Sequence, residues 1–158
     1  MNEVVFMFIE KAFENDAKVI SELIFSEFPY TKANEDNVKL RMQKPHIKLF
    51  KGVEKGEIAG FVELECLDNL FGVWRINGVT VSEKFRQKGF GKQLSEFAVE
   101  FAKKQKASKI LLLVRPDNYV AKKIYKKLGF QSTGLWKSQI NGKRAEEWVL
   151  ELEKNYIA

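Results

Sequence analysis

The residues between 79 and 92 are the part of this chain whose types and spacing most clearly suggest chemistry. They form the end of an apolar strand, a short polar turn, and the pattern Arg86-x-x-Gly89-x-Gly91 at the start of an amphipathic helix. Glycines at a helix start let a ligand approach the backbone, and the first helical turn leaves N–H groups without intrahelical partners. Together with the helix dipole and the nearby basic side chains, these donors predict a pyrophosphate site.

Two common nucleotide motifs do not fit this segment. A P-loop needs a serine or threonine after Gly91-Lys92, where this chain has Gln93. A dinucleotide-binding fingerprint needs a third glycine, where this chain has Leu94. The bland alternative is a glycine-bearing turn that only starts a helix.

A second segment, residues 118–130, follows the apolar strand Ile110–Val114. Asn118 and Tyr125 are seven residues apart, so they share one helical face. The residues of the expected apolar stripe are Val120, Ala121, Ile124, Tyr125 and Leu128. Four lysines occupy the other faces of this helix, and Gly129 is expected to end it.

The two segments, in this order and on these elements, resemble the Gcn5-related N-acetyltransferases (the GNAT superfamily). The resemblance implies acetyl-CoA as the cosubstrate, a primary amine as the acceptor, direct transfer and no metal. It also implies an α/β fold with a central, mostly antiparallel, splayed sheet flanked by helices on both faces. We therefore expect residues 1–158 to form one GNAT-like N-acetyltransferase domain.

The resemblance also implies roles for individual residues. Tyr125 matches a tyrosine that protonates the departing thiolate, and Asn118 matches an asparagine that contacts pantetheine. A core tyrosine and a helix N-cap are the respective alternatives. Tyr125 is the predicted catalytic residue, and the predicted cofactor-binding residues are Val79, Thr80, Val81, Arg86, Gln87, Lys88, Gly89, Phe90, Gly91, Lys92, Asn118 and Tyr125.

The general base stays open at this point. Many relatives carry a glutamate eleven residues before the motif's first position, and Arg75 occupies that position here. Glu63 and Glu65 lie on the neighbouring strand and could act through water. We prefer the alternative that they are solvent-facing or paired with Arg75.

The remaining elements follow from periodicity and turn signals. We expect strands at Val4–Ile9, Ile47–Val53, Ile58–Leu67 and Gly72–Val81, and a last hairpin of Gln131–Ile140 and Lys143–Leu152 around Asn141-Gly142. We expect a first helix, capped by Asp16, that turns Val19, Ile20, Leu23 and Ile24 inward, and a second from Asn34 to Met42.

Composition narrows the functional classes. The 158 residues, 45% of them hydrophobic, can bury a substantial core, and one cysteine suits a reducing cytoplasm. Residues 1–79 carry 10 basic and 13 acidic side chains, a net charge of −3, whereas residues 80–158 carry 17 and 8, a net of +9. A basic half suits a polyphosphate cosubstrate, and a mildly acidic half suits an amine.

The sequence thus predicts a cytoplasmic acetyl-CoA-dependent N-acetyltransferase without a membrane partner. Its acceptor stays open among polyamines, aminoglycosides, amino acids and protein amines, and a homodimer is possible. The alternatives are a non-catalytic CoA-binding sensor or assembly protein with a GNAT fold, and, less favoured, a basic nucleic-acid-binding domain.

Overall fold

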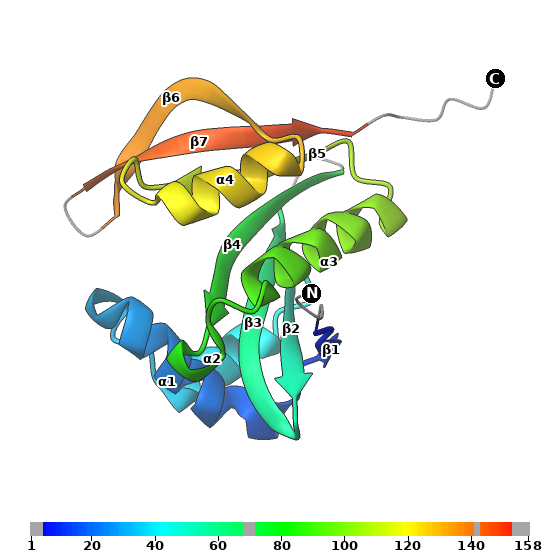
Figure 1. Ribbon diagram of the computed structural model, residues 1–158, viewed down its shortest axis with the longest axis vertical. Helices are drawn as coiled ribbons and strands as arrows, with labels where there is room; N and C mark the ends of the chain where they lie inside the picture. Colours follow the sequence, from blue (N-terminus) through cyan, green and yellow to red (C-terminus); the bar gives the residue numbers. More distant parts are fainter. Residues whose placement is uncertain (1–4, 68–71, 141–142, 153–158) are drawn as a thin grey trace.

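The computed structural model describes residues 5–67, 72–140 and 143–152, with residues 135–140 and 143 described by their backbone only (Figure 1). Short 3-10 turns occupy Glu14–Asp16, Pro29–Thr31 and Glu83–Phe85. The helices and strands, in chain order, are β1 (Phe8–Lys11), α1 (Ala17–Glu27), α2 (Glu35–Met42), β2 (Ile47–Glu54), β3 (Glu57–Cys66), β4 (Val73–Val81), α3 (Phe90–Lys104), β5 (Lys109–Val114), α4 (Tyr119–Lys127), β6 (Gln131–Ile140) and β7 (Lys143–Glu151).

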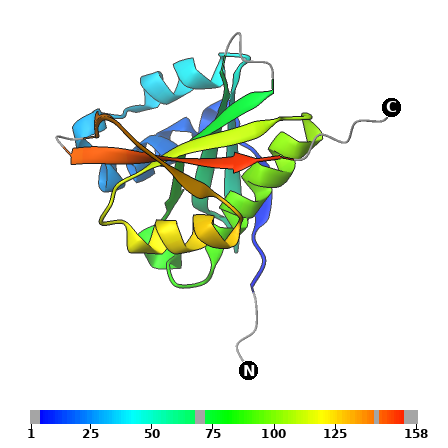
Figure 2. The same cartoon turned by 90° about the horizontal axis from the view of Figure 1, so that it is seen from above.

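The strands form one seven-stranded sheet in the order β1-β2-β3-β4-β5-β7-β6. Every neighbouring pair is antiparallel except β4 and β5, which run parallel. Helices α1 and α2 lie on one side of the sheet, and α3 and α4 lie on the other (Figure 2). The expected mixed α/β sheet with helices on both faces is therefore confirmed.

Two apolar clusters hold the layers together. On the α3–α4 face, Leu94 and Ala98 of α3 pack with alternate residues of β5, Ile110 and Leu112 among them. On the α1–α2 face, a smaller cluster joins Ile20, Val38, Ile47, Leu49 and Phe61. Alternation along β3 sends Val62 to the first cluster and Phe61 to the second, so this strand is covered on both faces.

Strand β4 parts from β5 before it ends. It pairs with β3 as far as Val81, but with β5 only through Val73–Ile76. The β3–β4 register also shifts, because Glu63 lies opposite Gly78 and Leu64 opposite Ile76, which leaves Asn77 as the bulged residue. The sheet is therefore splayed between β4 and β5, as expected.

Several local expectations were wrong. The first strand begins at Phe8 rather than Val4, and residue 4 lies outside the described residues. Val19 and Val120 are 40% and 74% exposed, so neither faces the core. Asp16 precedes α1 but makes no side-chain cap, because its carboxylate accepts from the Phe13 N–H and pairs with Lys51. The Asn141-Gly142 turn lies outside the described residues.

The contact between β3 and the end of β4 leaves no room for a side chain at Gly60. A Cβ there would lie 2.5 Å from the Thr80 carbonyl oxygen and 3.2 Å from the Val81 Cα. Gly60→Ala should therefore lower the free energy of unfolding by about 1–3 kcal/mol in urea denaturation. The atoms that the new Cβ would meet belong to the backbone of β4, which cannot rotate aside as a side chain can. Gly78→Ala is the matched control, since a Cβ at Gly78 has no neighbour within 4 Å. Equal stability of the two variants would contradict this account of the β3–β4 contact.

Candidate functional site

The loop that joins β4 to α3 folds back on itself through two left-handed residues. Gln87 has φ +65° and Gly89 has φ +79°, and Gly89 is the residue immediately before α3. The side chain of Phe90 is buried against Phe85, which fixes the start of the helix. The N–H of Gln93 donates to the Gly89 carbonyl, so the amides that precede it form the first turn of α3 and lack such partners by position.

The basic side chains of this loop differ in how far they are already engaged. The guanidinium of Arg86 pairs with Glu27 at the end of α1 and donates to the Val81 carbonyl. Lys88 lies over the Phe85 ring, with its Nζ 5.6 Å from the centroid, and Lys92 is 3.8 Å from Glu96. Arg86 therefore points toward α1 in this state, whereas the two lysines stay at the surface.

Tyr125 is a buried residue of α4 that faces α3. Its ring packs edge-on against Phe130, with 5.5 Å between the centroids. Burial raises the pKa of Tyr125 above its ordinary value of 10.0, and a hydrogen bond with the Ser95 side chain acts in the opposite direction. Ser95 in turn donates to the Gly91 carbonyl at 2.8 Å. Tyr125 thus keeps its proton at neutral pH and is joined through Ser95 to the first turn of α3.

Asn118 is the N-cap of α4. Its Oδ1 accepts from the Ala121 N–H at 3.2 Å. This helix-capping contact is the predicted alternative to a role in pantetheine binding. The neighbouring Tyr119 is 76% exposed. The capping contact uses one amide oxygen, so it fixes the orientation of the asparagine at the start of the helix.

The last residues of β4 line up between the loop and the place where the sheet opens. Val79 and Val81 are partly buried against the apolar cluster on the α3–α4 face. Thr80, between them, is buried. The Thr80 hydroxyl has no hydrogen-bond partner among the described residues. Since β5 pairs only as far as Ile76, the outer edge of residues 77–81 has no strand partner in the described part of the chain. An edge of this kind can pair with an extended ligand that carries amides.

The two glutamates of β3 have different surroundings on the α1–α2 face. The Glu63 carboxylate accepts from Arg41 Nε at 2.7 Å, from Arg41 Nη2 at 2.6 Å and from Asn77 Nδ2 at 2.6 Å. Glu65 accepts from Asn77 Nδ2 at 3.0 Å and lies 3.6 Å from Arg75 Nη2. The preferred pairing with Arg75 thus holds for Glu65. For Glu63 the partner is Arg41, which the sequence did not indicate.

Comparison with known proteins identifies the family. The profile of the Acetyltransferase (GNAT) family matches residues 13–130, about three quarters of the chain. The chain belongs to the GNAT family. A relative in Bacillus subtilis (strain 168), provisionally named a [ribosomal protein bS18]-alanine N-acetyltransferase, is 28% identical over 131 residues, which cover 78% of this chain and 80% of the relative.

Solved structures show the same fold. One is yncA of Salmonella typhimurium, a provisionally named acetyltransferase with its cofactor acetyl-CoA, which matches with a TM-score of 0.81 and 16% identity over 98% of each chain. Another is the ribosomal-protein-S18-alanine N-acetyltransferase of Escherichia coli, with a TM-score of 0.77 and 18% identity over 96% of this chain and 97% of that one. This GNAT protein is therefore an acetyltransferase.

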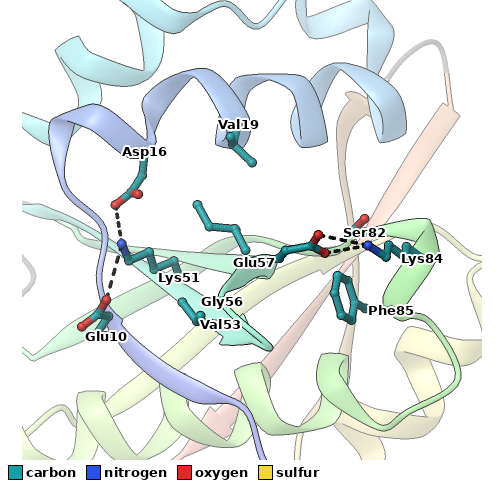
Figure 3. Close-up of a pocket in the computed structure, with 11 residues that line it drawn as sticks. Glu10, Asp16, Val19, Lys51, Val53, Gly56, Glu57, Ser82, Lys84 and Phe85 are labelled. Atoms are coloured by element: carbon teal, nitrogen blue, oxygen red, sulfur yellow. Dashed lines mark hydrogen bonds and ion pairs between the residues drawn. The ribbon is translucent and has the colours of Figure 1, made fainter.

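Two cavities are lined by residues other than the predicted cofactor-binding residues of this GNAT protein. One, of about 560 Å³, lies between α1 and the β2–β3 turn (Figure 3). In it Lys51 lies between Asp16 and Glu10, and Lys84 pairs with Glu57. The other, of about 250 Å³, lies over β4, β5 and β7. None of the twelve predicted site residues lines either cavity.

Metal ligands do not gather in the described part of the chain. No group of three or more histidine, cysteine, aspartate or glutamate side chains there could hold a metal ion. Within the same residues, no helix is both long and apolar enough to span a membrane.

If the loop between β4 and α3 binds the pyrophosphate, Gly89 is the loop residue whose substitution should weaken acetyl-CoA binding most. Gly89→Val should weaken acetyl-CoA binding at least tenfold in calorimetry, because a β-branched residue at φ +79° forces the loop out of its conformation. Gly91→Ala is the matched control for stability, since its Cβ would meet only Ile124 and Val81 at an ordinary 3.8 Å. If Gly89→Val folds and binds acetyl-CoA with unchanged affinity, the loop is not the phosphate site.

Proposed function

We propose that this protein transfers the acetyl group of acetyl-CoA directly to a primary amine. Three features of the structure support the proposal. These are the edge of β4 beyond Ile76, which has no strand partner among the described residues, the loop around Gly89 at the α3 N-terminus, and the buried Tyr125 on α4. An extended thioester with a pyrophosphate tail has the chemistry to occupy all three.

Each part of acetyl-CoA has a partner of matching chemistry. The pantetheine amides would pair with the main chain of Val79–Val81, and the pyrophosphate would accept from loop and α3 amides, with Lys88 and Lys92 adding charge. Asn118 would lie beside the pantetheine at the start of α4. The yncA structure, which contains acetyl-CoA on the same fold, supports this assignment.

The chain's own groups then divide the chemistry. The acceptor ammonium first loses a proton to solvent, and its neutral nitrogen attacks the acetyl carbonyl. A main-chain N–H at the β4 edge stabilises the oxyanion. When the C–S bond breaks, the Tyr125 hydroxyl gives its proton to the thiolate, and the second proton of the attacking nitrogen restores the tyrosine. Burial raises the pKa of Tyr125, so its hydroxyl carries a proton at neutral pH when the C–S bond breaks.

The acceptor amine is the part of the function that the relatives narrow most. Both the Bacillus subtilis relative and the Escherichia coli structure are named for the alanine of ribosomal protein S18. We therefore place α-amines of polypeptides first among acceptors. The deciding measurement is acetyl-CoA binding together with CoA release against a panel of N-terminal peptides, amino acids and polyamines. Binding with release on one amine class would support the proposal, whereas no binding would overturn it.

Replacing the proposed acid should affect turnover more than binding. Tyr125→Phe should lower kcat by about tenfold to a thousandfold with little change in the dissociation constant of acetyl-CoA, because the ring still packs while the proton donor is lost. Tyr119→Phe, an exposed tyrosine at the start of the same helix, is the matched control.

The pH dependence offers a second readout for Tyr125. Its folded-state pKa is raised, so its neutral form stabilises the fold below pH about 10, and this contribution is lost as pH rises through the folded-state pKa. The hydroxyl also stays protonated over the same range, so it can act as the acid throughout. The ratio of wild-type turnover to Tyr125→Phe turnover should therefore stay constant between pH 7 and about 10. A Tyr125→Phe enzyme with full kcat would return Tyr125 to a packing role.

A further inference from the structure

Two rows of side chains cross the α1–α2 face of the sheet where β4 begins to part from β5. In one row Glu65 lies opposite Arg75, and Arg75 lies beside Leu111 of β5. In the next row Leu113 lies opposite Glu147 of β7. Cross-strand partners point to the same side of a sheet, so these rows form one continuous surface.

The 250 Å³ cavity lies on this surface. Four leucines form most of its lining, and two charged residues complete it: Leu67, Leu111, Leu112, Leu113, Arg75 and Glu147. The volume is too small for a nucleotide and suits a compact apolar group. Helix α1 packs against β3 and β4 and α2 against β2, so the cavity lies beside the two helices rather than under them.

Glu65 and Glu63 differ in what they can still bind. Three donors already occupy the two oxygens of Glu63. In Glu65 both contacts go to Oε1, from Asn77 Nδ2 at 3.0 Å and Arg75 Nη2 at 3.6 Å. No hydrogen bond to Glu65 Oε2 is formed by the described residues, and the Glu65 side chain is 20% exposed. Glu65 is therefore a held carboxylate with one oxygen available, two residues from the cavity wall at Leu67.

We propose that Glu65 and this cavity select the acceptor, which is an α-amine on a carbon that bears a compact apolar side chain. The ammonium donates to Glu65 Oε2, and the apolar side chain lies among Leu67, Leu111 and Leu113. This assignment rests on the proposed acetyl transfer, since it places the amine on one face of the opening while acetyl-CoA occupies the other. Asn77 and Arg75 are positioning residues that hold Glu65 in place.

Such an α-amine has two sources, a free amino acid and the N-terminus of a polypeptide. Arg75 separates them, because its side chain lines the cavity, is 39% exposed and could pair with the α-carboxylate that only a free amino acid carries. The acceptor panel therefore contains leucine, leucinamide, isoamylamine, and tetrapeptide amides that begin with Gly, Ala, Leu, Lys or Asp. Preference for leucine over leucinamide indicates the amino acid, and preference for the peptides indicates the N-terminus.

Filling the cavity tests the side-chain site. In Leu113→Trp, kcat/KM for Leu-initial acceptors should fall at least tenfold relative to Gly-initial ones, because the indole takes the space of the acceptor side chain. The acetyl-CoA dissociation constant should not change. Leu113 is 36% exposed, so the larger residue is compatible with folding. The matched control is Val19→Trp, which fills the other cavity and should leave acceptor preference unchanged. The same acceptor ranking in both variants would overturn the proposal.

Neutralising Glu65 tests the amine contact. Glu65→Gln keeps an oxygen for Asn77 but loses the charge, so the acceptor KM should rise about tenfold or more with a smaller change in kcat. Glu65→Asp should recover part of the loss, and Glu100→Gln on α3 is the surface control. An unchanged KM in folded Glu65→Gln would overturn the contact. Failure of the proposed function is distinguishable, because then the wild-type protein itself would not bind acetyl-CoA or release CoA with any amine.

Discussion

The structure depends on β4 keeping its pairing with β3 after it has lost its pairing with β5. Through Ile76 the two parallel strands are joined, and beyond that residue β4 continues to Val81 with one edge that no other described strand pairs with. Unpaired backbone groups inside a fold are costly unless a partner replaces the lost strand. An extended amide ligand is such a partner. Because the loop and the α3 N-terminus follow Val81 directly, one continuous segment would supply both the proposed amide-pairing edge and the proposed anion site.

Interactions on the opposite face hold the end of β4 in place. Arg41 of α2 and Asn77 of β4 both donate to Glu63, so one carboxylate joins α2, β3 and the bulge. A buried carboxylate is tolerated when its oxygens are fully satisfied, and loss of one donor would leave a costly unpaired charge. On the other side of the strand pair, Gly60 allows the main chain of Thr80 to approach closely. The end of β4 is thus held by the hydrogen bonds to Glu63 on the α1–α2 face and by the close backbone contact at Gly60.

Local sequence patterns predicted the helices and strands well, but they did not predict every contact between these elements. Helical spacing located α3 and α4, whereas Val19 and Val120 are apolar residues that the pattern placed inside and the fold leaves exposed. The Glu65–Arg75 pair could be expected, because neighbouring antiparallel strands bring such residues together. The Arg41–Glu63 contact could not, since it depends on where α2 rests. The role of Asn77 follows from a one-residue bulge that alternation does not reveal.

The loop around Gly89 connects the two faces of the molecule electrostatically. Glu27 ends α1, where a negative charge opposes the helix dipole, and the Arg86 guanidinium offsets it. A pyrophosphate at the loop would compete with Glu27 for Arg86, so the full charge of Arg86 is not free for the ligand. In the proposed anion site, main-chain N–H groups would therefore contribute more than the arginine does. This explains why the backbone conformation at Gly89, rather than the identity of the basic side chains, is the feature on which cosubstrate binding should depend most.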